Sequence, residues 1–247
     1  MNDAPNAQRT LPADAIAVVA ALVLPTLLAS LYFVGLEKSE AAVQGTVYAA
    51  CKVVQFGFPL VWVFGVQRRK LTWERPGTAG IAEGILFGAL VLGILLAVYH
   101  LALKPAGLLA AAAGPVRERI AGFGIDGLAK YVALGAFLSV AHSFLEEYYW
   151  RWFCFGQLQR LLPWKLAAAV ASVGFMGHHV IVLAAYFGWA SPRTYVFSLA
   201  VAIGGAYWCW AFRRTGSLAG PWLGHLLVDV AIFLVGYDLM GGVWPTG

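Results

Sequence analysis

Seven long apolar runs separated by short polar connections constrain the fold of this chain more than any other feature. A helix of about 20 apolar residues crosses a hydrocarbon layer about 30 Å thick. Within a bilayer each backbone polar group must be satisfied internally, which a helix achieves within one run. We therefore predict an all-α polytopic bundle of about seven transmembrane helices, within a range of about six to eight, around a buried polar chamber. The expected spans are 15–36, 41–66, 78–103, 127–159, 165–187, 195–212 and 218–239.

The composition excludes an ordinary soluble protein. Hydrophobic residues make up 61% of the chain and charged residues 12%, whereas soluble domains carry roughly 25% charged residues. The 17 Lys and Arg outnumber the 12 Asp and Glu, but they gather at the ends of apolar runs, a pattern that orients helices. We expect the lipid bilayer as a partner, no nucleic acid, and a single integral-membrane domain over residues 1–247.

The polar connections predict an orientation. Residues 1–14 are expected to form a disordered leader before a retained span. With a cytoplasmic amino terminus, the most basic connection, 68–75, lies on the cytoplasmic side, as the positive-inside rule requires. The longest connection, 104–130, is expected to hold an interfacial helix on the other side. Lys52, inside the second run, has two interpretations, a snorkelling side chain or a group that handles protons or substrate.

The fourth run contains charged residues that are costly in a membrane. Glu146, Glu147 and Arg151 lie close together within it, and each charge near the bilayer centre costs at least ~2.5–3.5 kcal/mol, so such groups usually face a bundle interior and mark function. Residues four apart share a helix face, so His142 is expected beside Glu146 and Glu147 beside Arg151. We predict a supporting ion pair between Glu147 and Arg151.

Three helices bring ionisable residues to one depth. At 1.5 Å per residue, Glu146 lies ~21 Å above Arg160, and His179 lies ~21 Å above Lys165. His225 lies ~17 Å above the basic end of the preceding span, and Asp229 follows it by one turn. These depths predict a polar chamber shared by the three helices.

Carboxylates and imidazoles in one chamber can activate water. A buried glutamate can act as a general base, and a histidine can position the water or stabilise an oxyanion. The same four residues, Glu146, His179, His225 and Asp229, could instead hold a divalent metal such as zinc. The zinc-protease pattern HExxH is absent from the sequence. We expect that no cofactor is required and keep zinc as the alternative.

Three motifs in order resemble a known family. Glu146-Glu147-x-x-x-Arg151, Phe175-x-x-x-His179 and His225-x-x-x-Asp229 are similar to the motifs of the CAAX protease and bacteriocin-processing family of intramembrane endopeptidases. The resemblance covers about residues 128–239, which it identifies as the catalytic core.

The resemblance implies a role for each motif residue. Glu146 would be the base that activates water, His179 would hold that water, and His225 with residue 229 would stabilise the oxyanion. Glu147 with Arg151 would support them. Apart from the resemblance, Phe175 is expected to shape the site. His142 lies outside the motifs, where it is either a satisfied polar group or a supporting residue that tunes the pKa of Glu146. Relatives often carry Asn where this chain has Asp229, and an ionised aspartate cannot donate to an oxyanion. The role of Asp229 therefore stays open.

The expected function is hydrolysis of a peptide bond near the terminus of a membrane-associated protein or peptide. The substrate stays open among prenylated proteins, bacteriocin-type peptides and sorting tails. We expect a bacterial inner-membrane location. Two alternatives are a proton-coupled transporter that uses the same groups as a relay and a non-catalytic scaffold or immunity-type protein of the same fold.

Overall fold

The computed structural model describes residues 4–37, 39–69 and 77–241. All regular secondary structure in these residues is helical, and seven of their helices are long and apolar enough to cross a membrane. The prediction of an all-α polytopic fold with about seven spans is confirmed. The spans are Pro12–Gly35, Ala42–Val66, Thr78–Leu103, Leu128–Leu158, Trp164–Phe187, Pro192–Thr215 and Ala219–Leu239.

Glycine follows the end of two helices and proline begins one, each where its backbone conformation is suited to that position. Helix α8 (Trp164–Phe187) is followed by Gly188, and α9 (Pro192–Thr215) is followed by Gly216. Both glycines have positive φ, 84° and 68°, the left-handed conformation that commonly closes a helix. Pro192 is the first residue of α9, a position where its missing N–H costs nothing.

The chain divides into two compact units. The first contains Met1–Glu74, Tyr148–Ala184 and Trp189–Trp210, and the second contains Arg75–Glu147, Ala185–Gly188 and Ala211–Gly247. The division crosses the fourth span directly after the glutamate pair. The expectation of a single membrane domain stays a prediction.

The expected disordered leader is wrong over most of its length, because helix α1 (Ala4–Ser30) already includes it. Asp14 is buried and accepts hydrogen bonds from Trp62 Nε1 at 3.1 Å and Gln67 Nε2 at 2.7 Å. Arg160 Nη1 lies 3.2 Å from its other oxygen. Two hydrogen bonds and one ion pair thus stabilise, within the helix, a buried carboxylate that looks exposed from sequence alone.

The expected basic connection is described only in part, because 70–76 lie outside the described residues. Its predicted cytoplasmic location stays a prediction.

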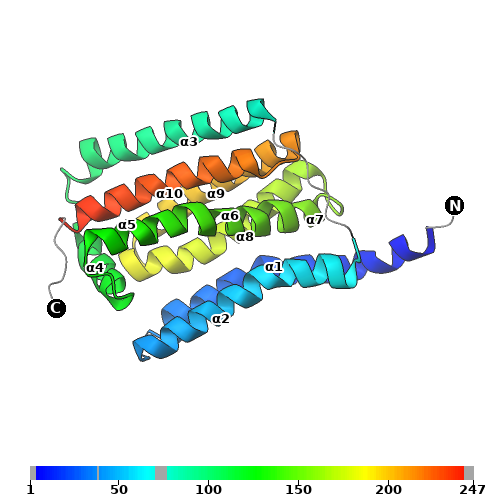
Figure 1. Cartoon of the computed structure of the whole chain (residues 1–247), viewed down its shortest axis with the longest axis horizontal. Helices are drawn as coiled ribbons and strands as arrows, with labels where there is room; N and C mark the ends of the chain where they lie inside the picture. Colours follow the sequence, from blue (N-terminus) through cyan, green and yellow to red (C-terminus); the bar gives the residue numbers. More distant parts are fainter. Residues whose placement is uncertain (1–3, 38, 70–76, 242–247) are drawn as a thin grey trace. The chain divides into compact units, whose positions relative to one another are not determined.

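In the first unit, α1 and its π-helical extension η1 (Leu31–Gly35) run beside α2 (Ala41–Leu60), which continues as η2 (Val61–Val66) (Figure 1). Helix α8 approaches α1 closely at Gly177, where an added Cβ would lie 2.9 Å from the hydroxyl of a threonine on α1. A small residue there allows the two backbones to approach.

In the second unit, α3 (Thr78–Val98), extended by η3 (Tyr99–Leu103), lies alongside α10 (Ala219–Leu239) (Figure 1). Glycines make this contact. An added Cβ on Gly84 would overlap the backbone of Gly220, and one on Gly88 would lie 2.8 Å from the carbonyl oxygen of Gly224. Small residues four apart allow such close helix packing in membranes.

The other side of α10 packs against α5 (Leu128–Phe137) and the π-helical η5 (Leu138–His142). Tyr131 donates to the carbonyl of Phe233 at 2.8 Å, and Trp222 Nε1 donates to that of Val140 at 2.9 Å. Helix α10 is therefore held in register from two sides.

The long connection holds η4 (Ala110–Ala112) and the expected short helix, α4 (Ala113–Gly122). Arg117 fastens α4 to the end of α10 by donating to the carbonyl of Met240 at 2.7 Å. The interfacial location of α4 stays a prediction.

We expect Gly84→Ala to destabilise the protein. Its Cβ would meet backbone that cannot rotate away, and overpacking of this kind costs about 1–3 kcal/mol. Gly93→Ala on the same helix is the matched control, because its Cβ would meet nothing within 4 Å. Thermal unfolding in detergent measures the difference, and equal stability of the two variants would contradict the glycine contact.

Candidate active site

The two adjacent glutamates lie on a short helical segment between two π-helical ones. Helix α6 (Ser143–Glu147) follows η5 and continues into η6 (Tyr148–Phe155) and α7 (Gly156–Leu158). The expected single long helix is therefore continuous, but its hydrogen-bond register changes on both sides of the pair. π-Helical turns are rare and occur frequently at functional sites.

In the second unit, Glu147 holds the ring of His225. Glu147 Oε1 lies 2.7 Å from His225 Nδ1, and both side chains are buried. An ionised carboxylate only accepts, so Nδ1 carries a hydrogen and donates it. This contact fixes the orientation of the imidazole.

The opposite edge of the same ring faces two more carboxylates. His225 Nε2 lies 3.7 Å from Glu146 Oε2 and 3.7 Å from Asp229 Oδ1. Both distances exceed hydrogen-bond length and fall within ion-pair range. The structure therefore gathers Glu146, Glu147 and Asp229 around the imidazole of His225. Of these three contacts, only the one between His225 and Asp229 follows from helical spacing.

In the first unit, the backbone sets the orientation of His179. Its Nδ1 lies 2.9 Å from the carbonyl oxygen of Phe175, and a carbonyl only accepts, so Nδ1 carries a hydrogen. In neutral His179 the lone pair then lies on Nε2, where it can accept a hydrogen bond from water. The Phe175 ring, 4.7 Å away and nearly perpendicular, further restricts the imidazole.

Trp150 and His178 form a second layer behind His179. The two rings are nearly parallel with centroids 5.7 Å apart, and the His178 ring lies 4.2 Å from that of His179. His178 is therefore in ring contact with both Trp150 and His179.

Arg151 lies against aromatic faces in the first unit. Its guanidinium carbon is 4.5 Å from the ring centroid of Phe175 and 4.9 Å from that of Trp208. The side chain is 1% exposed, and a desolvated cation over aromatic rings is stabilised by their quadrupoles. Gly205 permits this, since an added Cβ would lie 3.3 Å from Arg151 Nη2.

The predicted site residues are thus found in both units. Glu146, Glu147, His225, Asp229 and His142 belong to the second, and His179, Phe175 and Arg151 belong to the first. The shared chamber and the pairing of Glu147 with Arg151 concern both units and stay predictions. The sequence did not predict the hydrogen bond between Glu147 and His225 or the contact between Arg151 and Trp208. Neither contact produces a periodic signal in the sequence.

A metal site would need several of the candidate side chains to converge on one point. Among the described residues, no group of three or more His, Cys, Asp or Glu side chains is arranged so that it could hold a metal ion. Metal-independent action stays a prediction.

The chain matches a known protein family over part of its length. Residues 128–231 match the family model described as Type II CAAX prenyl endopeptidase Rce1-like. No curated protein and no solved structure matches the chain.

The apolar spans and this match indicate an integral membrane protein with a segment that is similar to a protease family. The match over residues 128–231 confirms the predicted resemblance to CAAX-type intramembrane proteases. This segment includes the four predicted catalytic residues, and the first three spans lie outside it.

We expect Glu147→Met to lower stability strongly. It would leave the buried Nδ1–H of His225 without its acceptor, and breaking a buried pair from one side costs about 3–5 kcal/mol. Glu147→Gln should lose less, because its amide oxygen still accepts.

The control for this prediction is Glu83→Met, which removes an ion pair with the half-exposed Arg214. Exposed pairs contribute about 1 kcal/mol or less. Unfolding in detergent measures all three variants, and equal losses for Glu147→Met and Glu83→Met would show that the His225 contact is unimportant.

Proposed function

We propose that the protein is an intramembrane endopeptidase that hydrolyses a peptide bond near the terminus of a membrane-associated protein or peptide. Glutamate-activated water is the nucleophile. The observation that carries the proposal is the imidazole of His225, held by Glu147 on one edge and facing Glu146 and Asp229 on the other. The Rce1-like match supports the protease class.

The reaction requires one base and one acid at the scissile bond. Glu146 takes a proton from water while the water oxygen attacks the carbonyl carbon, which forms a tetrahedral oxyanion. Collapse of this intermediate breaks the C–N bond, and the proton on Glu146 passes to the departing amine. His179, whose Nε2 can accept, orients the same water.

Glu147 and Asp229 give His225 its role. With Nδ1–H donated to Glu147, Nε2 can donate to the oxyanion only when the ring is an imidazolium. Carboxylate oxygens at 2.7 Å and 3.7 Å compensate that cation, as the aspartate of a hydrolase triad compensates its histidine. Asp229 therefore supports the imidazolium instead of donating to the oxyanion itself.

The substrate class follows from the membrane setting and the family description. We infer a substrate anchored in the bilayer, of which a protein with a prenylated cysteine close to its carboxyl terminus is one example. The protein is proposed to act in a bacterial inner membrane with a cytoplasmic amino terminus, because this orientation places the most basic connection inside.

We expect Glu146→Gln to reduce turnover by ~10²–10⁴-fold without loss of stability, as is usual when a general base is removed. The measurement compares cleavage of membrane peptides and thermal unfolding for wild type and variant. Glu118→Gln, which changes an exposed glutamate on α4, is the control and should keep full activity. An inactive, stable Glu147→Gln beside an active Glu146→Gln would reverse the assignment of the base.

We also expect chelators to leave turnover unchanged, because Glu146 supplies the activation that a metal would otherwise provide. Elemental analysis of the purified, active protein should find less than one zinc per chain. Stoichiometric zinc, with activity lost on chelation and restored by zinc, would overturn the metal-independent mechanism.

A further inference from the structure

Trp150 lies within a group of aromatic rings in the first unit. It is 1% exposed, and its ring centroid lies 5.5 Å from that of Phe175 and 5.7 Å from that of His178, both on α8. The planes of the indole and the His178 ring differ by only 3°. His178 and Phe175 are in turn the two rings that contact His179, at 4.2 Å and 4.7 Å. The indole is therefore connected to His179 through both of its ring neighbours.

A glycine on α8 makes room for this indole. An added Cβ on Gly174 would lie 3.0 Å from Trp150 Cζ3 and 3.3 Å from Cη2, so even a methyl group would press against the ring. Gly174 and His178 are four residues apart and share one face of α8. The indole therefore covers this face of α8, and the glycine allows it to lie flat against the imidazole of His178.

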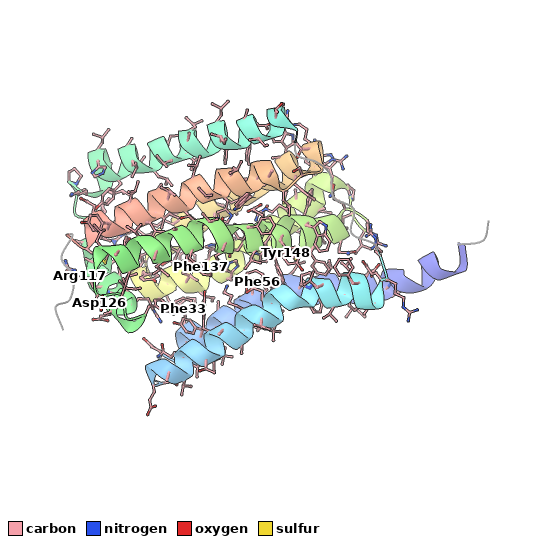
Figure 2. The ribbon with its side chains drawn as sticks, in the orientation of Figure 1. Phe33, Phe56, Arg117, Asp126, Phe137 and Tyr148 are labelled. Carbon is pink, nitrogen blue, oxygen red and sulfur yellow. The ribbon has the colours of Figure 1, made fainter. Side chains whose placement is uncertain are left out.

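Two tyrosines fix the segment η6 that carries Trp150. Tyr148 donates to the carbonyl of Phe56 on α2 at 3.2 Å (Figure 2), and Tyr149 donates to the carbonyl of Ala21 on α1 at 2.7 Å. These hydroxyl groups anchor the two residues directly before Trp150 to two different helices. A side chain on such an anchored segment has little freedom to move, which is what the support of a reacting group requires.

The indole of Trp150 makes its contacts through the ring. Among the described residues, Trp150 Nε1 has no hydrogen-bond partner, although a buried indole N–H usually finds one. Burying such a donor costs free energy, and the ring contacts must offset that cost. A flat ring at this position, and not its N–H, is therefore the feature that contacts His178 and Phe175.

We propose that Trp150 is a positioning residue for the hydrolytic reaction and holds the imidazole of His179 in place through His178 and Phe175. His179 accepts a hydrogen bond from water at Nε2 only while its Nδ1–H stays on the carbonyl of Phe175. The ring contacts restrict rotation away from that carbonyl. This inference rests on the proposed endopeptidase function. It assigns a role to Trp150 and His178, which the three motifs do not specify.

The first test observes His179 without turnover. NMR of protein in lipid bilayers, with ¹⁵N in the histidine rings, distinguishes a ring nitrogen that carries hydrogen from one that does not. The chain has five histidines, and comparison with His179→Gln assigns the signals of His179. Wild type should show hydrogen on Nδ1. Trp150→Leu and His178→Leu should raise the fraction with hydrogen on Nε2, whereas Trp150→Phe and His178→Phe retain a flat ring and should keep the wild-type signals.

The second test measures turnover of membrane peptides. Trp150→Leu and His178→Leu should lower kcat by about 100-fold, the loss expected when a reacting group is misplaced by about 1 Å. KM should stay unchanged, because the misplaced group acts in the chemical step. Trp150→Phe and His178→Phe should retain most of kcat. A loss in the Phe variants equal to that in the Leu variants would overturn the proposal, because the ring contact would then not be the cause.

Phe153→Leu is the matched control. Phe153 is fully buried on the same segment as Trp150, and its ring lies 5.8 Å from that of Phe58 and 6.4 Å from that of Tyr149. The substitution should lower thermal stability but leave kcat and the His179 signals unchanged. Equal effects of Phe153→Leu and Trp150→Leu on these signals would reduce the role of Trp150 to general packing and overturn the proposal.

The two measurements separate this inference from the function on which it rests. If Trp150→Leu changes the His179 signals but wild type cleaves no peptide, the endopeptidase proposal fails and the positioning of His179 stands. If wild type shows Glu146-dependent cleavage and Trp150→Leu changes neither kcat nor the signals, the positioning fails and the protease stands. Thermal unfolding checks that each variant is folded. Gly174→Ala, which adds one methyl group against the indole, replaces Trp150→Leu if that variant does not fold and should shift the signals in the same direction.

Discussion

The second unit depends on the backbone contact between α3 and α10. No hydrophobic driving force brings two helices together inside lipid, so close van der Waals packing must do it. The glycines at 84, 88, 220 and 224 remove the side chains that would hold the axes apart. Gly224 directly precedes His225, and the packing that seats α10 therefore also sets the position of the imidazole. The geometry of the candidate site around His225 is in this sense a product of helix packing.

The imidazole in turn organises the charges around it. A lone carboxylate at this depth would be costly, but three of them share one ring that can become a cation, two at its Nε2 edge and one at Nδ1. In the first unit, Arg151 finds its stabilisation in aromatic faces. The protein thus uses two different physical means, ion pairing and cation–π contact, to keep ionisable groups inside apolar helices.

Apolar run length predicted the seven spans because the hydrocarbon thickness allows few other solutions. Helical spacing predicted the pairing of His225 with Asp229, since both lie on one helix. It could not predict that Glu147 bonds a ring 78 residues away, because spacing reports only neighbours on the same helix. The prediction of a disordered leader was wrong, because a polar sequence does not show which buried donors, such as those that bond Asp14, lie beside it in the fold. Glycines spaced four apart on α3 and α10 are visible in the sequence, and they form the contact between these two helices, which the lengths of the apolar runs do not predict.

The distance in sequence between Glu147 and His225 has a consequence for how the protein is made. A ribosome adds about 5–20 residues per second, so the 78 residues that separate the two take about 4–16 s to synthesise. During this interval Glu147 exists without the histidine to which it will bond. The newborn chain must therefore keep that carboxyl group in a hydrated or protein-lined environment until α10 has been synthesised.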